Sequence, residues 1–244
     1  MTTGKVEPFD ATSRKAIRGE VERMRASPVA LDRPLLILSG WRSPGLGATL
    51  GVRLRRLTGA SKSEVISFAY PFAGRIEPSA TKVARKTAQR FGTINPEQTV
   101  AVDVVAVSMG GLVARAAASS LTEMPRLNIR RLFTLGTPHR GALLADKVRV
   151  DQASRDMQPG SPFLARLDEE LDANPFEIIA YAALDDWMVG ATNTAPPGRD
   201  PIWFKGAPLL SHHLISRNMP IVVDIARRLR GEEPIAEPSR PPRD

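Results

Sequence analysis

The sequence predicts an α/β fold, with a mostly parallel β-sheet and helices on both faces. Short apolar runs, typical of buried strands, alternate along the chain with amphipathic stretches whose apolar residues recur at helical spacing. The chain has 244 residues, of which 42% are hydrophobic and 25% charged, enough for one α/β domain with a sizeable core. Because strands that alternate with helices are joined by crossovers, the sheet is expected to be parallel and covered on both sides.

Five apolar runs predict the strands of this sheet. Ser39-Gly40 closes the first run, Pro71 stops the second, and the third is rich in Val. In chain order the predicted strands are Leu35–Leu38, Val65–Tyr70, Thr99–Val107, Ile129–Leu135 and Ile178–Leu184.

The amphipathic stretches predict the helices. Ser79 is a candidate N-cap for the helix that it begins, because its hydroxyl can accept a hydrogen bond from the first turn. In the last helix, Ile221, Val222, Ile225 and Leu229 fall on one side. The predicted helices are Asp10–Arg25, Leu46–Leu57, Ser79–Phe91, Gly110–Leu121, a stretch that ends with Asp168–Ala173, and Pro220–Arg230.

These elements predict three parts of the chain. Residues 1–33 form an N-terminal helical segment and residues 34–230 form the α/β domain. Residues 231–244 are rich in Pro and charge with almost nothing to bury, so we expect a disordered or loosely packed tail. Residues 141–175 are long for one connection, and we expect them to cap the site as a lid through Met157, Phe163, Leu164 and Leu167; an ordinary surface helix is the alternative.

The charge balance first suggests a nucleic-acid partner, because Lys and Arg number 34 against 26 Asp and Glu, a net charge of +8. The basic residues are spread along the chain among acidic ones, and only 5% of residues are aromatic. No basic stretch alternates with aromatics as a stacking platform requires. We therefore expect solvated basic faces and no nucleic-acid partner, with attraction to an anionic interface as the alternative.

The cysteine count limits the chemistry that the protein can perform, and the lengths of the apolar runs indicate its compartment. The chain has 0 Cys, which excludes disulfides, Cys-ligated metal sites and a thiol nucleophile. Its N-terminus has no apolar stretch of signal-peptide type, and the longest apolar runs are far shorter than the ~20 residues that cross a bilayer. We therefore expect a cytoplasmic protein.

The most specific local signal is the junction at Ser108. The Val-rich strand runs directly into Ser108, and a helix follows at once. A Ser on a sharp strand-to-helix turn exposes its Oγ beside the helix N-terminus, where backbone N–H groups favour developing negative charge. The close approach of strand and helix requires small residues two positions away on either side, and Ala106 and Gly110 meet that need. The alternative is that Ser108 only caps the helix.

Two motifs carry a resemblance to a known family. Ala106-Val-Ser108-Met-Gly110 resembles the nucleophile elbow, G-x-S-x-G, of the α/β-hydrolases, and in particular of bacterial lipases and esterases. Ala replaces the first Gly, and Val107 stands where this branch mostly carries His. Leu135-Gly-Thr-Pro-His139 resembles a strand end of lipases and of hydrolases that deacylate lipid anchors; there the resemblance implies a structural or rim role for His139.

The resemblance covers roughly Leu35 to Leu229, and it implies the remaining site residues. Asp186 matches the acid that orients the catalytic His, with Asp185 as the fallback. The His lies before the last helix, where His212 and His213 stand; the apolar residues that follow favour His212, with His213 as the fallback. The helix before the first strand implies a minimal α/β-hydrolase fold that lacks the first antiparallel strands.

The resemblance also implies an oxyanion hole and a substrate pocket. The backbone N–H groups of Met109 and Trp41 are the expected donors. The expected substrate-binding residues are Gly40, Phe72, Trp187 and Met188, with Pro71, Leu143 and Leu144 as further pocket candidates. No metal or cofactor is expected.

The functional expectation is a serine hydrolase of the esterase or lipase type, which cleaves a small-molecule or lipid carboxylic ester through an acyl-enzyme on Ser108. An acyltransferase or thioesterase with the same three residues is one alternative. A non-catalytic binding protein on the same fold is the other. The oligomeric state stays open.

Overall fold

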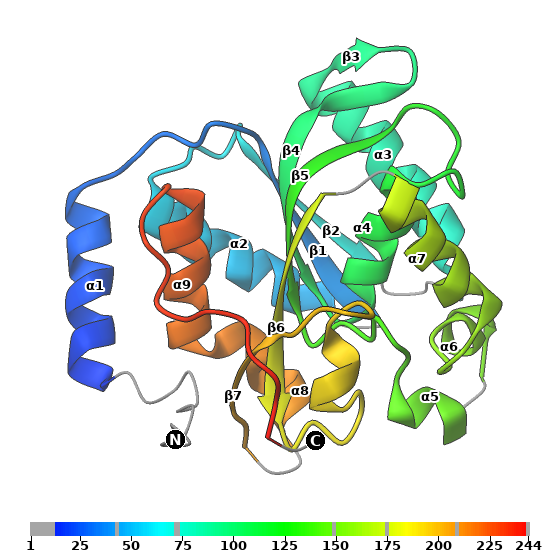
Figure 1. The fold of residues 1–244 in the computed structure, drawn as a ribbon. Coiled ribbons are helices and arrows are strands. Elements are labelled where there is room, and N and C mark those ends of the chain that lie inside the picture. Colours follow the sequence, from blue (N-terminus) through cyan, green and yellow to red (C-terminus); the bar gives the residue numbers. More distant parts are fainter. Residues whose placement is uncertain are drawn as a thin grey trace.

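A computed structural model describes residues 13–41, 44–70, 74–147, 150–173, 176–207 and 210–242. Over these residues the chain forms a seven-stranded sheet with helices on both sides (Figure 1). The strand order is β2-β1-β4-β5-β6-β7, and each neighbouring pair in that row is parallel. The short strand β3 pairs antiparallel with β4. This architecture confirms the predicted fold class.

All five predicted strands are present, with ends that differ by a few residues. Two strands were not predicted, β3 and β7. The first is short and fully exposed, so it has no apolar pattern. The second has three buried apolar residues, Ile202 to Phe204, but it has only 4 residues and follows a Pro-rich loop. The strands are β1 Leu35–Trp41, β2 Val65–Tyr70, β3 Thr93–Asn95, β4 Gln98–Val107, β5 Arg126–Leu135, β6 Glu177–Leu184 and β7 Ile202–Lys205.

The predicted helices are present as well, together with short helices that the sequence analysis did not separate. The α-helices are α1 Arg14–Ala26, α2 Pro44–Thr58, α3 Ile76–Phe91, α4 Met109–Ala118, α5 Leu143–Lys147, α6 Gln152–Asp156, α7 Pro162–Ala173, α8 Ser211–Leu214 and α9 Met219–Leu229. Two 3₁₀ segments, η2 Ala191–Thr194 and η3 Ile215–Arg217, complete the list. No helix among the described residues combines the length and the apolar character that crossing a membrane requires.

The sheet divides the core into two layers. Helices α1, α2 and α9 lie on one face, and α3, α4 and α7 lie on the other (Figure 1). Side chains of each strand alternate between the two: Leu36 and Leu38 of β1 pack with α3 and α4, whereas Leu35 and Ile37 pack with α2 and α9. Both faces are therefore buried, which is why the strands read as continuous apolar runs.

The start of α3 corrects one prediction. Ser79 was expected to cap this helix, but the helix begins three residues earlier, at Ile76, and its N-cap residue is Arg75. Ser79 lies inside the first turn, where its hydroxyl donates to the Arg75 carbonyl. Pro78 does not break the helix, because N–H groups in the first turn need no intrahelical acceptor.

The segment after α9 corrects another. Residues 231–242 were expected to be disordered or loosely packed, but hydrogen bonds hold them against the domain. The Asp224 carboxylate, which is fully buried in α9, accepts the backbone N–H of Ile235 at 2.6 Å. Further along, the Trp203 indole donates to the Ser239 hydroxyl at 2.8 Å. The physical reason is that a buried carboxylate needs donors, and this segment supplies them.

The carboxyl ends of the parallel strands meet at one edge of the sheet. Strand β4 ends at Val107, directly before Ser108, and β6 ends at Leu184, directly before Asp185 and Asp186. Helices α5 and α8 lie at this edge (Figure 1). In open α/β sheets, ligands bind beyond the carboxyl ends of the strands, so this edge is the place to look for a site.

Candidate functional site

Ser108 occupies the sharp turn between β4 and α4. Its backbone has φ 52° and ψ −128°, a conformation that residues other than Gly rarely adopt. Helix α4 passes so close to β1 that a Cβ at Gly110 would lie 2.7 Å from the carbonyl oxygens of Leu38 and Ser39. The small residue expected two positions after Ser108 is therefore a steric requirement of this turn.

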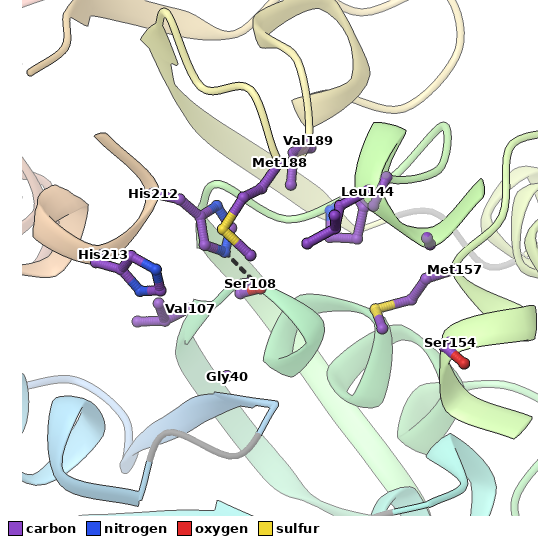
Figure 2. A pocket seen from close by; sticks show the side chains of 13 residues that line it. Gly40, Val107, Ser108, Leu144, Ser154, Met157, Met188, Val189, His212 and His213 are labelled. Carbon is purple, nitrogen blue, oxygen red and sulfur yellow. Dashed lines mark hydrogen bonds between the residues drawn. The ribbon is translucent and has the colours of Figure 1, made fainter. Parts of the chain in front are cut away.

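Ser108, His212 and Asp186 form a chain of hydrogen bonds. His212 Nε2 lies 2.9 Å from Ser108 Oγ (Figure 2). On the other side of the ring, His212 Nδ1 lies 2.9 Å from Asp186 Oδ2. An ionised carboxylate only accepts, so the imidazole places its proton on Nδ1. Nε2 is then the acceptor for the Ser108 hydroxyl proton, which is the geometry that a general base requires.

Asp186 is itself held in place by the backbone. Its other oxygen, Oδ1, accepts the N–H groups of Met188 at 3.0 Å and Val189 at 3.2 Å. The Asp186 side chain is fully buried, and the three donors compensate for the cost of burying its charge. The acidic side chain is thus fixed in the orientation that meets His212.

The two fallback residues lie beside this chain and are not part of it. Asp185 has φ 67° in the turn that follows β6, and the contact to the imidazole is made by Asp186. His213 is exposed, and its ring lies 6.0 Å from that of His212 at an interplanar angle of 83°. His213 lines the pocket close to Val107 (Figure 2).

His139 lies in the interior and not at the rim. Arg115 donates to His139 Nδ1 at 3.2 Å, so the ring proton is on Nε2, which lies 3.2 Å from Thr134 Oγ1. Complete burial is the first cause that lowers the pKa of His139 well below its usual value of 6.5, and the positive charge of Arg115 is the second. His139 is therefore a neutral structural residue.

The expected oxyanion donors lie at the two sides of Ser108. Met109 is the first residue of α4, and the first N–H groups of a helix have no acceptor within the helix. On the other side, a Cβ at Gly40 would lie 3.1 Å from Ser108 Cβ and 3.7 Å from Ser108 Oγ, so the β1 backbone reaches Ser108 directly. Trp41 follows Gly40 as the last residue of β1.

An apolar pocket of about 100 Å³ opens beside Ser108 and His212 (Figure 2). Of the expected substrate-binding residues, Gly40 and Met188 line it. Trp187 is half exposed and does not, while Phe72 and Pro71 lie outside the described residues. Of the further candidates, Leu144 lines the pocket and Leu143 does not. The other residues of the lining are Val107, Pro138, Ala142, Ala145, Ser154, Met157, Val189 and His213.

Several of these lining residues were not predicted as such. Met157, which directly follows α6, was expected as part of the lid. Ala142 and Ala145, at the start of residues 141–175, were not named. The only sequence signal for them was the length of that connection. Helix α7, by contrast, packs Phe163, Leu164 and Leu167 into the core layer of α4. Residues 141–175 thus consist of a part that lines the pocket and a part that packs in the core; their role as a lid stays a prediction.

No group of three His, Asp or Glu side chains in the described parts of the chain lies close enough together to hold a metal ion.

Comparisons with known proteins agree with this fold. A family model described as a domain of unknown function, DUF7379, matches residues 78–158, which is less than half of the chain. No curated protein sequence matches.

Three solved structures are similar to the chain. The lipase BlEst2 of Bacillus licheniformis in its propeptide form gives a TM-score of 0.57 at 16% identity, covering 87% of this chain and 54% of that one. The phospholipase PlaB of Legionella pneumophila in complex with thio-NAD gives 0.58 at 11%, covering 81% and 58%. The product of the gene lin2722 of Listeria innocua gives 0.58 at 13%, covering 82% and 95%.

This chain spans little more than half the length of the first two of these structures. Identities this low show the fold alone. The chain therefore has the fold of lipases and esterases, the α/β-hydrolase fold.

Proposed function

We propose that this chain, which has the α/β-hydrolase fold, is a serine hydrolase that cleaves carboxylic esters through an acyl-enzyme on Ser108. The observation that carries the proposal is the chain of two 2.9 Å hydrogen bonds from Ser108 through His212 to Asp186. It lies at an apolar pocket and on a strained turn that exposes the Ser hydroxyl. Nucleophile, base and orienting acid are the three parts that acyl transfer requires.

The first half of the reaction forms the acyl-enzyme. His212 Nε2 takes the proton from Ser108 Oγ as Oγ bonds to the ester carbonyl carbon. The tetrahedral intermediate then collapses, the carbon–oxygen bond to the alcohol breaks, and His212 gives its proton to the leaving alcohol. In the second half, His212 removes a proton from water as the water oxygen bonds to the acyl carbon. The bond between that carbon and Ser108 Oγ then breaks, Oγ takes the proton back from His212, and the acid leaves.

Asp186 supports both halves by holding the imidazole in one tautomer. While His212 carries the extra proton, the Asp186 carboxylate stabilises the imidazolium through the Nδ1 hydrogen bond. Because Asp186 receives two backbone N–H groups on its other oxygen, it does not need to move during the cycle.

The negative charge on the substrate oxygen is assigned to backbone donors. Met109 N–H at the start of α4 is the first, since the helix dipole adds to its effect. Trp41 N–H is the second candidate, because the backbone at Gly40 directly contacts Ser108. Removing one such donor costs a factor of roughly 10²–10³ in rate where it has been measured in other hydrolases.

The size of the pocket favours a short acyl chain. A dry cavity of about 150 Å³ can hold benzene, with its six carbon atoms. A pocket of about 100 Å³ accordingly suits an acyl chain of roughly four carbon atoms. Met157 lines the side of the pocket that faces away from His213 (Figure 2), so Met157→Ala should shift the preference toward longer p-nitrophenyl esters.

The direct test is hydrolysis of p-nitrophenyl butyrate by the wild type and by Ser108→Ala. We expect turnover by the wild type and a loss on the order of 10³-fold or more in the variant, together with loss of labelling by a fluorophosphonate. Ser61→Ala, which changes an exposed serine remote from the pocket in sequence and structure, serves as the control. A folded wild type that hydrolyses no p-nitrophenyl ester and takes no label contradicts the proposal and leaves the non-catalytic binding protein.

The same three residues also serve acyl transfer and thioester cleavage. Product analysis with a competing alcohol separates a hydrolase from an acyltransferase, since the latter forms a new ester in water. An acyl thioester offered beside the matching oxygen ester tests the thioesterase alternative.

A further inference from the structure

The strained backbone of Ser108 is held from both sides by β5 and the turn that follows it. Ser108 N–H donates to the Leu135 carbonyl at 2.8 Å, and the Ser108 carbonyl accepts the Thr137 hydroxyl at 2.7 Å. These two bonds fix the peptide groups on either side of the residue. A conformation this unfavourable persists only where its surroundings hold it, and Leu135 and Thr137 supply that constraint.

The Thr137 side chain has little freedom to move away. It is fully buried, and it lies against the first turn of α4. A Cβ at Gly111 would lie 2.4 Å from Thr137 Oγ1 and 2.6 Å from its Cγ2. Helix α4 thus leaves room for the threonine only because residue 111 has no side chain, and the hydroxyl is packed in place against the Ser108 carbonyl.

The neighbouring residue of the same turn touches the base. Gly136 has φ 60°, and its N–H donates to the Tyr181 carbonyl of β6 at 3.0 Å. A Cβ on Gly136 would lie 3.3 Å from His212 Nδ1 and 3.4 Å from His212 Cε1. The imidazole therefore rests against the backbone of this turn, one residue before the threonine that holds Ser108.

We propose that Thr137 is a positioning residue, and that the Gly136–Thr137 turn sets the distance between Ser108 Oγ and His212 Nε2. Thr137 forms a hydrogen bond to the backbone of the nucleophile, and the backbone at Gly136 limits how far the imidazole of the base can move. One rigid turn therefore fixes the positions of both reacting groups relative to each other. The expected effect on the reaction rests on the proposed function. The expected effect on geometry does not.

The test compares three variants. Thr137→Val removes the hydroxyl and keeps the shape, whereas Thr137→Ser keeps the hydroxyl. Thr122→Val is the matched control, because the buried Thr122 hydroxyl donates at 2.8 Å to the Ala116 carbonyl at the other end of α4. The measurements are kcat and KM for p-nitrophenyl butyrate, the rate of fluorophosphonate labelling, thermal unfolding, and the crystal structures of wild type and Thr137→Val.

We expect Thr137→Val to lower kcat and the labelling rate by about tenfold to a hundredfold with KM within about twofold, since a misplacement near 1 Å costs rate and not ground-state binding. Thr137→Ser should restore kcat to within about threefold. Thr122→Val should lose stability to a similar degree and keep its kcat. Thr137→Val with wild-type kcat, or a loss of kcat that Thr122→Val matches, overturns the proposal.

The crystal structures test the positioning role of Thr137 independently of the proposed function. In Thr137→Val we expect the Ser108 carbonyl to rotate and the contact between Ser108 Oγ and His212 Nε2 to lengthen. A wild type that shows neither hydrolysis nor labelling contradicts the proposed function. In that case the Ser108 geometry in the Thr137→Val structure is the test of the present inference. Unchanged Ser108 geometry in that structure overturns it. Should Thr137→Val not fold, Thr137→Ala removes the same hydroxyl with no added methyl and carries the same expectations.

Discussion

Two buried histidines near the carboxyl edge of the sheet have opposite surroundings. His139, in the interior, receives a hydrogen bond from the Arg115 guanidinium, and burial followed by that positive charge lowers its pKa well below 6.5. His212, at the pocket, donates to the Asp186 carboxylate and faces Ser108 Oγ. A cation beside an imidazole opposes protonation, whereas an anion beside it stabilises the imidazolium.

The difference shows that the partner, and not burial alone, determines what a histidine can do. Both rings are bonded through both nitrogens, and both lie where solvent has little access. Only His212 has a carboxylate on one side and a hydroxyl on the other, which is the arrangement that the proposed general base requires. His139 fills space and joins Arg115 to Thr134 without charge.

Exchanging each histidine for glutamine gives the largest expected effects. His212→Gln removes the base, and we expect kcat/KM for p-nitrophenyl butyrate to fall on the order of 10³-fold or more with little change in stability. His139→Gln should keep kcat/KM within about tenfold and lower the free energy of unfolding by roughly 2–4 kcal/mol, because it disturbs a fully buried polar contact. Urea unfolding beside the kinetics checks both. A large loss of kcat/KM in His139→Gln together with nearly unchanged kcat/KM in His212→Gln would refute the comparison.

Asp186→Asn removes the anion beside His212 and is expected to have the next largest effect. The amide no longer holds the Nδ1–H tautomer, so kcat should fall on the order of 10²–10³-fold, less than for loss of the nucleophile. Asp185→Asn is the matched control, since Asn tolerates the positive φ found there. It should keep kcat within about threefold. A larger loss in Asp185→Asn than in Asp186→Asn would move the orienting role to the fallback residue.

The pH dependence of stability tests the other histidine. The pKa of His139 is lower in the fold than in the unfolded chain, so the unfolded state binds the extra proton as pH falls below about 6.5. The stability contributed by neutral His139 is thus complete above that pH and is lost below it. We expect a loss of up to about 2 kcal/mol between pH 7 and pH 5. Urea unfolding should show that this part of the slope disappears in His139→Gln; an unchanged slope would contradict the assignment.

Arg115→Met removes the cation beside His139 and is expected to change the pH dependence least. Burial is the larger cause of the lowered pKa of His139, and burial remains in the variant. The loss of stability between pH 7 and pH 5 should therefore shrink by less than half. The same urea series measures it. Complete loss of the slope would show that the guanidinium, and not burial, keeps His139 neutral.

The sequence alone predicted the fold class and five of the seven strands, because their apolar runs are local signals. It also named Ser108, Asp186 and His212 from motifs, and the structure brings these three side chains together. Their catalytic roles stay a prediction. A motif shows the type of a residue and its order along the chain, and here these two were sufficient to select the three side chains.

Contacts between distant segments could not be predicted in the same way. Thr137 belongs to the motif Leu135–His139, but the motif does not show that its hydroxyl bonds to the backbone of Ser108, 29 positions earlier. Ala142 and Ala145 line the pocket, and no local pattern marks them for that place. The segment after α9 looked too polar to be ordered, since the carboxylate that binds it, Asp224, lies in a helix that reads as simply amphipathic.

That segment links the two ends of the described chain. Glu20 of α1 pairs with Arg23 and Arg227, and Glu232 pairs with the same Arg23 and with Arg230. One network of charges therefore fastens α1 and the segment after α9 to the same helix. A protease that cuts after Arg230 would remove Glu232 from this network and leave α1 with fewer ion pairs to α9. Helix α1 should therefore become susceptible to digestion soon after the segment behind α9 is cut off.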